Sequence, residues 1–259
     1  MSTLLCFHAH PDDESIATGG TIARAVSEGH RVVLVIATDG RHGENPPDLM
    51  SGETLVDRRR SETESSAEAL GAHAVHWLGY SDSGMTGWPQ NDEPGAFMHA
   101  DVEEAADRLV RILRDENVDV MTCYDWHGGY GHPDHIQVHR VGHRAAELYG
   151  DVRLFESTMN RTRIVAMLKE NTDRPEDWDP EGPADDGNPF GSTEDEITMA
   201  VDVSAFIDQK RSSIMCHASQ MTDNGFFAQM PPEVFAVAFG TEWFIEPGAP
   251  GGAKLGWLL

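Results

Sequence analysis

The sequence predicts an α/β domain in which strands and helices alternate around a mostly parallel sheet. Apolar, β-branched runs such as RVVLVIAT (Arg31–Thr38) are typical of strands that are covered on both faces. Segments with helical periodicity follow such runs, as at Asp101–Glu116. Glycine follows the end of an expected helix, as Gly71 does after Thr54–Leu70. This alternation is typical of βαβ units and favours a Rossmann-like, three-layer domain.

The elements are expected where apolar residues run together, for strands, or recur every three or four positions, for helices. Gly29 marks the end of the first helix, and Pro133 suits the first turn of the fourth. In chain order, the expected strands are Leu4–His10, Arg31–Thr38, Ala74–Leu78, Val118–Tyr124, Val152–Ser157 and Ile197–Val203. The expected helices are Ser15–Glu28, Thr54–Leu70, Asp101–Glu116, Pro133–Leu148 and Ala205–Met221.

A segment rich in Asp, Glu, Pro and Gly interrupts the alternation at Asn171–Glu196. It is either a partly mobile loop or lid, or only a solvated insertion. We find no repeat and no second boundary, so residues 1–259 are expected to form a single domain with this acidic loop insertion at about 171–196. The apolar tail Leu255–Leu259 packs either on its own core or on another subunit, which leaves a homo-oligomer open.

Composition excludes several classes of protein. The chain has 259 residues, of which 39% are hydrophobic and 24% charged, as in globular proteins. Its formal net charge of -25 argues against nucleic acid or an anionic membrane surface as the main partner. No apolar run approaches the ~18 residues of a membrane span, and no signal peptide is expected. The three cysteines lie far apart, which favours a reducing, cytoplasmic setting.

Ionisable side chains crowd the ends of two expected strands. The stretch HAHPDDE (His8–Glu14) ends the first strand, and DWHGGYGHPDHIQVHRVGH (Asp125–His143) follows the strand that ends at Tyr124. Open α/β sheets bind their ligands beyond the carboxyl ends of strands, so the two stretches could meet there. Neutral imidazole and carboxylate are ligands of catalytic Zn²⁺, which keeps one position open for water. The spacing favours a hydrolytic metal site over a merely polar, histidine-rich turn.

The chemistry of such a site needs three kinds of group. The metal lowers the pKa of its bound water to about 7 and polarises a substrate carbonyl. A carboxylate that is not a ligand takes the proton of the water, and a donor stabilises the oxyanion. The adjacent Asp12 and Asp13 can divide the roles of base and ligand. His139 and His143, four and eight residues after His135, are either further ligands or surface and capping residues.

HAHPDDE together with GHPDH (Gly131–His135) resembles the PIG-L, or LmbE-like, family of zinc-dependent N-deacetylases. That family includes the deacetylase of GlcNAc-phosphatidylinositol and the deacetylase and amidase of mycothiol metabolism. The resemblance covers roughly Leu4–Val165 and less clearly Lys210–Met221. Both motifs are long and occur in the family's order, which makes the pair specific.

The resemblance implies zinc ligands and a base in the first motif. His10, Asp13 and His135 look like the ligands of one Zn²⁺ per chain. Asp12 looks like the general base. Another divalent transition metal fits the same ligands.

The resemblance also implies groups that act on the carbonyl oxygen and the leaving amine. His132 looks like the acid that stabilises the oxyanion and protonates the amine, and Asp134 would orient it. Tyr130 occupies the position of a mobile tyrosine that assists the carbonyl oxygen. Its alternative is a purely structural role.

Three more positions match substrate-binding residues of the family. Arg59 and Asp82 match positions that bind sugar hydroxyls, and His217 in CHASQ matches a C-terminal position. Because Arg58, Arg59 and Arg60 are consecutive, the register leaves Arg60 open. The alternatives are a surface arginine or ion pair for Arg59 and a turn residue for Asp82.

The sequence therefore predicts a zinc-dependent hydrolase that removes an N-acetyl group from an amino sugar or a glycoside-like small molecule. A metal-bound water attacks, with Asp12 as general base. One alternative is an amidase that cuts a larger acyl group or a mycothiol-type conjugate. Another is a metal- or sugar-binding protein without turnover, which would have no need of a carboxylate beside the ligand Asp13.

Overall fold

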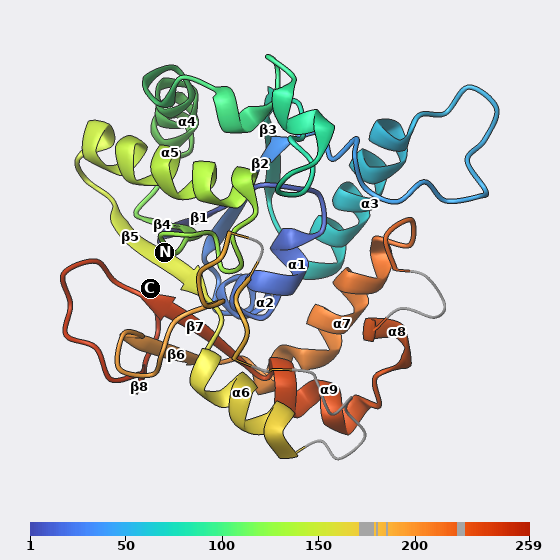
Figure 1. The fold of residues 1–259 in the computed structure, drawn as a ribbon. Helices are drawn as coiled ribbons and strands as arrows, with labels where there is room; N and C mark the ends of the chain where they lie inside the picture. The colour runs from blue at the N-terminus through green and yellow to red at the C-terminus, as the bar shows by residue number, and fades with distance from the viewer. Residues whose placement is uncertain (171–178, 180, 185, 222–225) are drawn as a thin grey trace.

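The computed structural model describes residues 1–170, 179, 181–184, 186–221 and 226–259. Within these residues, one eight-stranded sheet lies between two layers of helices, as Figure 1 shows. The strands are β1 (Thr3–His8), β2 (Arg31–Thr38), β3 (Ala74–Tyr80), β4 (Val120–Tyr124), β5 (Arg153–Thr158), β6 (Met199–Asp202), β7 (Thr241–Ile245) and β8 (Lys254–Leu255). The α-helices are α1 (Asp13–Ala17), α2 (Gly19–Ser27), α3 (Leu55–Leu70), α4 (Val102–Glu116), α5 (Pro133–Tyr149), α6 (Arg161–Glu170), α7 (Ile207–Cys216), α8 (Phe226–Gln229) and α9 (Pro232–Phe239). Short 3₁₀ turns lie at Pro89–Asp92, Phe97–His99 and Ser204–Phe206.

The order of the strands places the ends of β1 and β4 side by side. The sheet runs β3-β2-β1-β4-β5-β7-β6-β8, and the first five of these strands pair in parallel. The chain moves outward from β1 to β3, and then crosses back to β4 on the other side of β1. Such a reversal opens a crevice at the carboxyl ends of the two strands, where doubly wound folds bind ligands. The predictions of a mostly parallel sheet and of a three-layer domain are confirmed.

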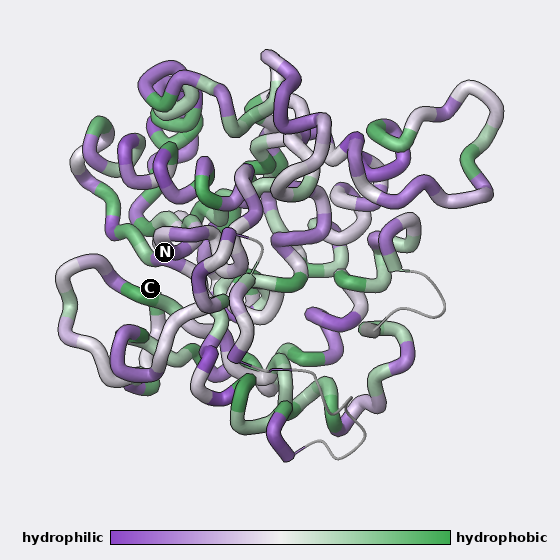
Figure 2. Tube along the Cα trace, in the orientation of Figure 1, coloured by the Kyte–Doolittle hydropathy of each residue, from purple (hydrophilic) through white to green (hydrophobic). Residues whose placement is uncertain are grey.

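Alternate residues of β1 belong to the hydrophobic cores on the two faces of the sheet. Leu5 and Phe7 belong to the core cluster under α4 and α5, whereas Leu4 and Cys6 belong to the cluster under α2 and α3. All four are fully buried, which explains the continuous apolar run. Each such side chain stabilises the fold by roughly 1.5–3 kcal/mol. Figure 2 shows the matching pattern on the helices, where hydrophobic and hydrophilic residues alternate along α4 and α5.

The first expected helix is two helices, broken at Thr18. Thr18 lies at φ −134°, and its Oγ1 lies 2.9 Å from Nε2 of His8. The N–H groups of Gly20 and Thr21 each donate to the carboxylate of Glu242 at 2.8 Å. A carboxylate at a helix N-terminus is stabilising, so it favours a new start at Gly19. The expected first strand also ends early, at His8, which leaves His10 in the loop.

The C-terminal third departs most from expectation. The strand expected at Ile197–Val203 is β6, and it pairs antiparallel with β7. The helix expected at Ala205–Met221 is a 3₁₀ turn followed by the shorter α7. Elements α6, α8, α9, β7 and β8 were not expected, because their short apolar runs lack a clear period.

The tail and the acidic segment each have a described part. Leu258 is fully buried in the cluster under α2 and α3, so the tail packs on its own core.

Part of the expected acidic loop, 171–178, 180 and 185, lies outside the described residues. Its last part packs beside the site, where the N–H of Gly191 donates to the carbonyl of Gly129 at 2.6 Å. Among the described residues, no helix combines the length and apolar character needed to cross a membrane.

Candidate metal centre

The loop after β1 makes a tight turn that brings Asp13 back to His10. Asp12 has φ 111°, in a region that only glycine adopts readily. The Asp12 N–H donates to Oε2 of Glu14 at 3.0 Å, and the Ser15 hydroxyl donates to the Asp12 carbonyl at 2.7 Å. The His10 N–H donates to Oδ2 of Asp13 at 2.8 Å. These bonds hold a strained backbone in place, as is common at functional sites.

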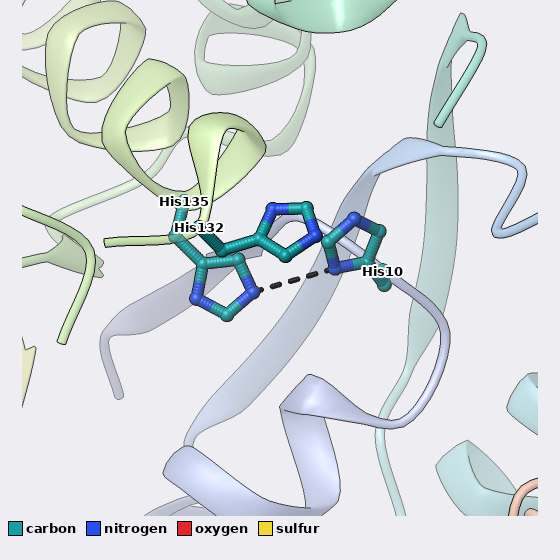
Figure 3. Close-up of side chains that lie close together, drawn as sticks. All are labelled: His10, His132 and His135. Atoms are coloured by element: carbon teal, nitrogen blue, oxygen red, sulfur yellow. Dashed lines mark hydrogen bonds between the residues drawn. The ribbon is translucent and has the colours of Figure 1, made fainter. Parts of the chain in front are cut away.

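Three side-chain atoms from β1's loop and from α5 form a compact triangle. His135 Nε2 lies 3.3 Å from His10 Nδ1 and 3.4 Å from Asp13 Oδ2, and the His10 and Asp13 atoms are 3.5 Å apart. Figure 3 shows His10 facing His135 across this gap, with His132 beside them. Tetrahedral Zn²⁺ with bonds of about 2.0–2.2 Å separates its ligand atoms by roughly 3.3–3.6 Å. The expected ligand set therefore fits such an ion.

His132 belongs to the same group of histidines. Ligand atoms of His10, His132 and His135 all lie within 4.8 Å of one another. In the triangle with Asp13, every separation is 3.5 Å or less, as the bonds of tetrahedral Zn²⁺ require. We therefore take Asp13 as the third member of the set, as the sequence predicts, and His132 as its neighbour.

Carboxylates behind His10 fix which of its nitrogens faces the triangle. His10 Nε2 lies 3.1 Å from Oδ2 of Asp134 and 3.5 Å from Oδ1 of Asp82. A proton on Nε2 leaves Nδ1 with its lone pair toward Asp13, and such a carboxylate partner is usual for metal-binding histidines. Burial lowers the pKa of His10, but Asp82, Asp13 and Asp134 together raise it well above its usual range. A metal ion must displace the second proton, on Nδ1, so the affinity of the site for the ion falls as the pH falls.

His135 is oriented in the same way. Its Nδ1 lies 3.2 Å from the carbonyl of Gly128, which can only accept, so Nε2 keeps its lone pair. The ring stacks on Tyr124 with centroids 4.5 Å apart. Burial raises the pKa of the Asp13 carboxyl, but His135 and His10 lower it well below its usual range. The positions of all three groups thus suit a cation, which replaces the extra proton of His10 when it binds.

Asp12 lies beside this set and is tied to Arg59. The Nη2 of Arg59 donates to Oδ2 of Asp12 at 3.1 Å and to the carbonyl of Pro11 at 2.5 Å, and Nη1 donates to the carbonyl of Gly40 at 2.7 Å. Burial raises the pKa of Asp12 to about 6, although Arg59 opposes this rise. The structure thus places a carboxylate of raised pKa next to the candidate ligands.

Arg59, the arginine expected to bind sugar hydroxyls, contacts protein groups in the structure. Arg59 is only 4% exposed, and it holds Asp12 and the backbone of two loops. It forms no ion pair with Glu62, which instead accepts from Ser219. Arg60 lies over the ring of Trp77 at 5.0 Å, so Arg59 is the one of the two that contacts Asp12, and which of them binds sugar hydroxyls stays a prediction.

Asp134, the residue expected to orient His132, contacts other groups in the structure. The Asp134 carboxylate bonds His10 and Ser83, where it accepts from the Ser83 N–H at 2.8 Å and from the hydroxyl. His132 is held instead by the backbone, because the Asp134 N–H donates to its Nδ1 at 3.1 Å. In the structure, therefore, the Asp134 carboxylate contacts His10, whereas its expected role in orienting His132 stays a prediction.

Tyr130 lies in the same loop and is half-buried. Its ring centroid is 5.0 Å from that of His135 and 6.2 Å from that of His132, both in an edge-on arrangement. It is therefore next to the candidate centre, as expected.

Two more residues expected to bind substrate, Asp82 and His217, contact protein groups in the structure, and their binding of substrate stays a prediction. Asp82 is 4% exposed, and its carboxylate accepts from the N–H groups of Gly84 and His42 beside His10. His217 is fully buried, with Nε2 2.7 Å from Oε1 of Glu14. Both side chains are buried, and they hold the loops of the site through these contacts.

Sequence reasoning missed three residues that shape the centre. Glu14 stands in the first motif and joins the Asp12 backbone to His217 and Ser66. Ser83 binds Asp134, and Tyr124 stacks on His135 while its hydroxyl lies 2.9 Å from His8 Nδ1. Only Glu14 carried a signal, since it lies inside the quoted motif.

Comparison with known proteins agrees with this arrangement. The family GlcNAc-PI de-N-acetylase, PIG-L, matches residues 5–146. The chain is 39% identical to the 1D-myo-inositol 2-acetamido-2-deoxy-α-D-glucopyranoside deacetylase of Acidothermus cellulolyticus over 258 residues, covering 95% of this chain and 88% of that one. It is also 39% identical to the protein of the same name from Thermobifida fusca over 244 residues, covering 86% and 84%.

A solved structure gives the same picture. The N,N'-diacetylchitobiose deacetylase of Pyrococcus horikoshii superimposes with a TM-score of 0.60 at 26% identity, over 94% of this chain and 82% of that one. The fold and the histidine–carboxylate centre thus define an N-deacetylase, a hydrolase of carbon–nitrogen amide bonds. The chain belongs to the PIG-L family.

Proposed function

We propose that this protein removes the acetyl group from an N-acetylglucosaminyl inositol, releasing acetate and a free amine. The names of the relatives from Acidothermus cellulolyticus and Thermobifida fusca specify such a glycoside. The observation that carries the proposal is the triangle of His10, Asp13 and His135 next to the carboxylate of Asp12. That arrangement is suited to amide hydrolysis.

One Zn²⁺ per chain is the ion we assign to the triangle. Two imidazoles and one carboxylate form a common set for catalytic zinc, and their separations match its bond lengths. When bound, the ion lowers the pKa of water and polarises the acetyl carbonyl. Asp82 and Asp134 keep His10 in the tautomer that binds through Nδ1.

Asp12 is the proposed general base. It takes a proton from the attacking water, and its pKa of about 6, raised by burial, suits a base that works near neutral pH. Arg59 holds the carboxylate by one oxygen, Oδ2, and so fixes its direction. The strained turn at Asp12 serves the same purpose, since it separates the base from the ligand Asp13.

His132 is the proposed donor to the oxyanion and then to the leaving amine. Its Nδ1 accepts from the backbone, so in the neutral ring the proton is on Nε2. Burial lowers the pKa of this imidazole far below its usual range, and His10 and His135 lower it further. The free site therefore holds His132 as a neutral donor. Tyr130, at the edge of the same rings, is proposed to assist the carbonyl oxygen.

We also propose a cellular location and a domain organisation for the enzyme. All three cysteines are free, which supports a reducing, cytoplasmic location. We propose that residues 1–259 act as a single domain, because the site draws on loops after β1, β3 and β4 and on the buried His217.

The test is an assay of the zinc-loaded protein against N-acetylglucosaminyl inositol, N-acetylglucosamine and an N-acylated thiol conjugate, with detection of free amine. The Asp12→Ala variant serves as the blank. We expect amine release from the inositol glycoside that is absent in the variant. Release from the thiol conjugate alone would replace the proposal by the amidase alternative, and no release from any compound would contradict it.

A further inference from the structure

A second group of side chains that could bind a metal ion lies between β4, β5 and α5. It consists of Cys123 on β4, Glu156 on β5, and His139 and His143 on α5. Ligand atoms of Cys123, His139 and His143 all lie within 4.8 Å of one another. We propose that these four residues form a second site, for a divalent transition metal such as Zn²⁺, that ties α5 to the sheet.

The sheet supplies two of the four groups, from directly paired positions on neighbouring strands. Cys123 and Glu156 are directly paired in the parallel register of β4 and β5, so their side chains are on the same face. Cys123 is 1% exposed, and the Glu156 side chain is 12% exposed. One group is therefore a buried sulfur and the other a carboxylate that reaches toward solvent.

The helix supplies the other two groups from one face. His139 and His143 are four residues apart, and their ring centroids are 4.2 Å apart. His143 Nε2 lies 2.7 Å from Oε1 of Glu156, and His139 Nδ1 lies 3.6 Å from the same oxygen. Both rings therefore lie beside the carboxylate, and Nε2 is the nitrogen of His139 left for a metal ion, because its Nδ1 also faces the Tyr124 carbonyl.

Gly142 lets the helix come this close to the sulfur. A Cβ at this position would lie 2.8 Å from Cβ and 3.2 Å from Sγ of Cys123, closer than side chains tolerate. Any other residue would push α5 away from β4 and separate the histidines from the thiol. Gly142 lies between His139 and His143, so this close approach occurs in the part of α5 that carries both imidazoles.

The hydrogen bond of His139 leaves one of its ring nitrogens for a metal ion. His139 Nδ1 lies 3.0 Å from the carbonyl of Tyr124, which places the proton on Nδ1 and leaves Nε2 free. Metal binding would release the proton of the Cys123 thiol to solvent and form a thiolate ligand.

Sulfur, two imidazoles and a carboxylate together select a particular class of ion. Thiolate and imidazole suit Zn²⁺ and its neighbours, whereas Mg²⁺ and Ca²⁺ prefer oxygen ligands. The His139 and His143 side chains are 20% and 32% exposed, so an ion can enter from solvent. The triangle of His10, Asp13 and His135 contains no sulfur, which makes the two sites separable by spectroscopy.

The experiment is a Co²⁺ titration of metal-free protein, read by absorption and by bound metal per chain. In an Asp13→Ala background, where the triangle is broken, we expect one bound equivalent with a sulfur-to-cobalt charge-transfer band in the near ultraviolet. Cys123→Ser should abolish the band. Because that variant alters the core, His143→Gln at a half-exposed position provides the second test, with an affinity at least about tenfold weaker.

The matched control is Cys6→Ser, which changes another fully buried cysteine that has no histidine pair beside it. It should keep both the band and the affinity. A missing band in the Asp13→Ala protein would overturn the proposal, as would a band that survives Cys123→Ser. Unchanged affinity in His143→Gln would also overturn it. None of these outcomes depends on the deacetylase assay.

Discussion

At the scale of single residues, the site depends on the groups behind the ligands. Asp134 is fully buried and connects Ser83, after β3, to His10, after β1. It therefore fixes the tautomer and the direction of His10 without being part of the triangle. Carboxylates of this kind raise metal affinity by holding a ligand in one orientation.

Asp134→Asn should therefore weaken zinc binding. The amide keeps the size of the side chain but loses the charge that holds the proton on Nε2 of His10. We expect a dissociation constant about 10–100-fold higher, measured by competition with a chromophoric chelator. The exposed Asp208→Asn on α7 is the control. Equal affinity in Asp134→Asn and wild type would contradict the role.

His132→Ala should affect turnover rather than metal content. The variant loses the Nε2 donor, so kcat should fall by at least about 10²-fold. The metal content should stay at the wild-type value, because the triangle does not include His132. Steady-state kinetics and metal analysis on one sample decide the matter, and an unchanged kcat would remove His132 from the mechanism.

The candidate ligands could be predicted from sequence, but their supports could not. His10, Asp13 and His135 stand in two motifs whose residue types already suggest a metal. The contact between Asp134 and His10 spans 124 positions and arises only because β1 and β4 are neighbours. Residue spacing carries no information about such a pair.

At the scale of elements, the loop from Asp125 to α5 is held by glycines. Gly128 has φ +67°, and a Cβ there would overlap Cβ of His135 and come within 2.7 Å of the His135 backbone. Asp125 accepts from the N–H of Gly129 at 2.8 Å and so anchors the loop. The position of His135 thus depends on the absence of a side chain at Gly128.

Gly128→Ala should displace His135 and weaken metal binding by at least about tenfold. Gly129→Ala is the matched control, because Gly129 has a similar φ of +78° but, among the residues that the structure describes, a Cβ there meets only Met159, at 3.5 Å. Both variants carry the same backbone strain, so the difference between them isolates the clash. If the two variants bind zinc equally well, the clash does not matter for the site.

The break between α1 and α2 shows the limit of local reasoning about elements. The sequence from Ser15 to Glu28 has a continuous helical period, which predicts one helix. Glu242, more than 200 residues away, accepts two N–H groups at the start of α2 and also binds Lys210 at 2.5 Å. This buried carboxylate starts a new helix that no local pattern indicates.

At the scale of the whole molecule, the strand order is what unites the two motifs. Strand–helix alternation was sufficient to predict the layers and the mostly parallel sheet. The mixed edge of β7, β6 and β8 was not predictable, because antiparallel pairing of short strands depends on where the chain returns. The site lies at the switch between β1 and β4, on the part that was predictable.

The stability of the whole fold should fall in mild acid, partly through His8. Burial lowers the pKa of His8 from 6.5 to about 4, and its ring bonds Tyr124 and Thr18. The unfolded chain therefore binds more protons between these two values, so stability is lost as the pH falls from 6.5 through 4. This group alone should contribute roughly 3 kcal/mol to that loss.

Urea unfolding of metal-free protein across this range checks the effect. The His8→Asn variant should show a shallower fall in the free energy of unfolding than the wild type. Equal falls in both proteins would show that His8 does not cause the acid sensitivity.

The central claim is that the neighbours Asp12 and Asp13 divide the roles of base and ligand. The most direct test measures bound zinc and deacetylase turnover on Asp12→Ala and Asp13→Ala beside wild type. We predict that Asp12→Ala keeps the full zinc content and loses turnover, whereas Asp13→Ala loses one equivalent of zinc together with turnover. Loss of zinc in Asp12→Ala, or full zinc content in Asp13→Ala, would contradict the account.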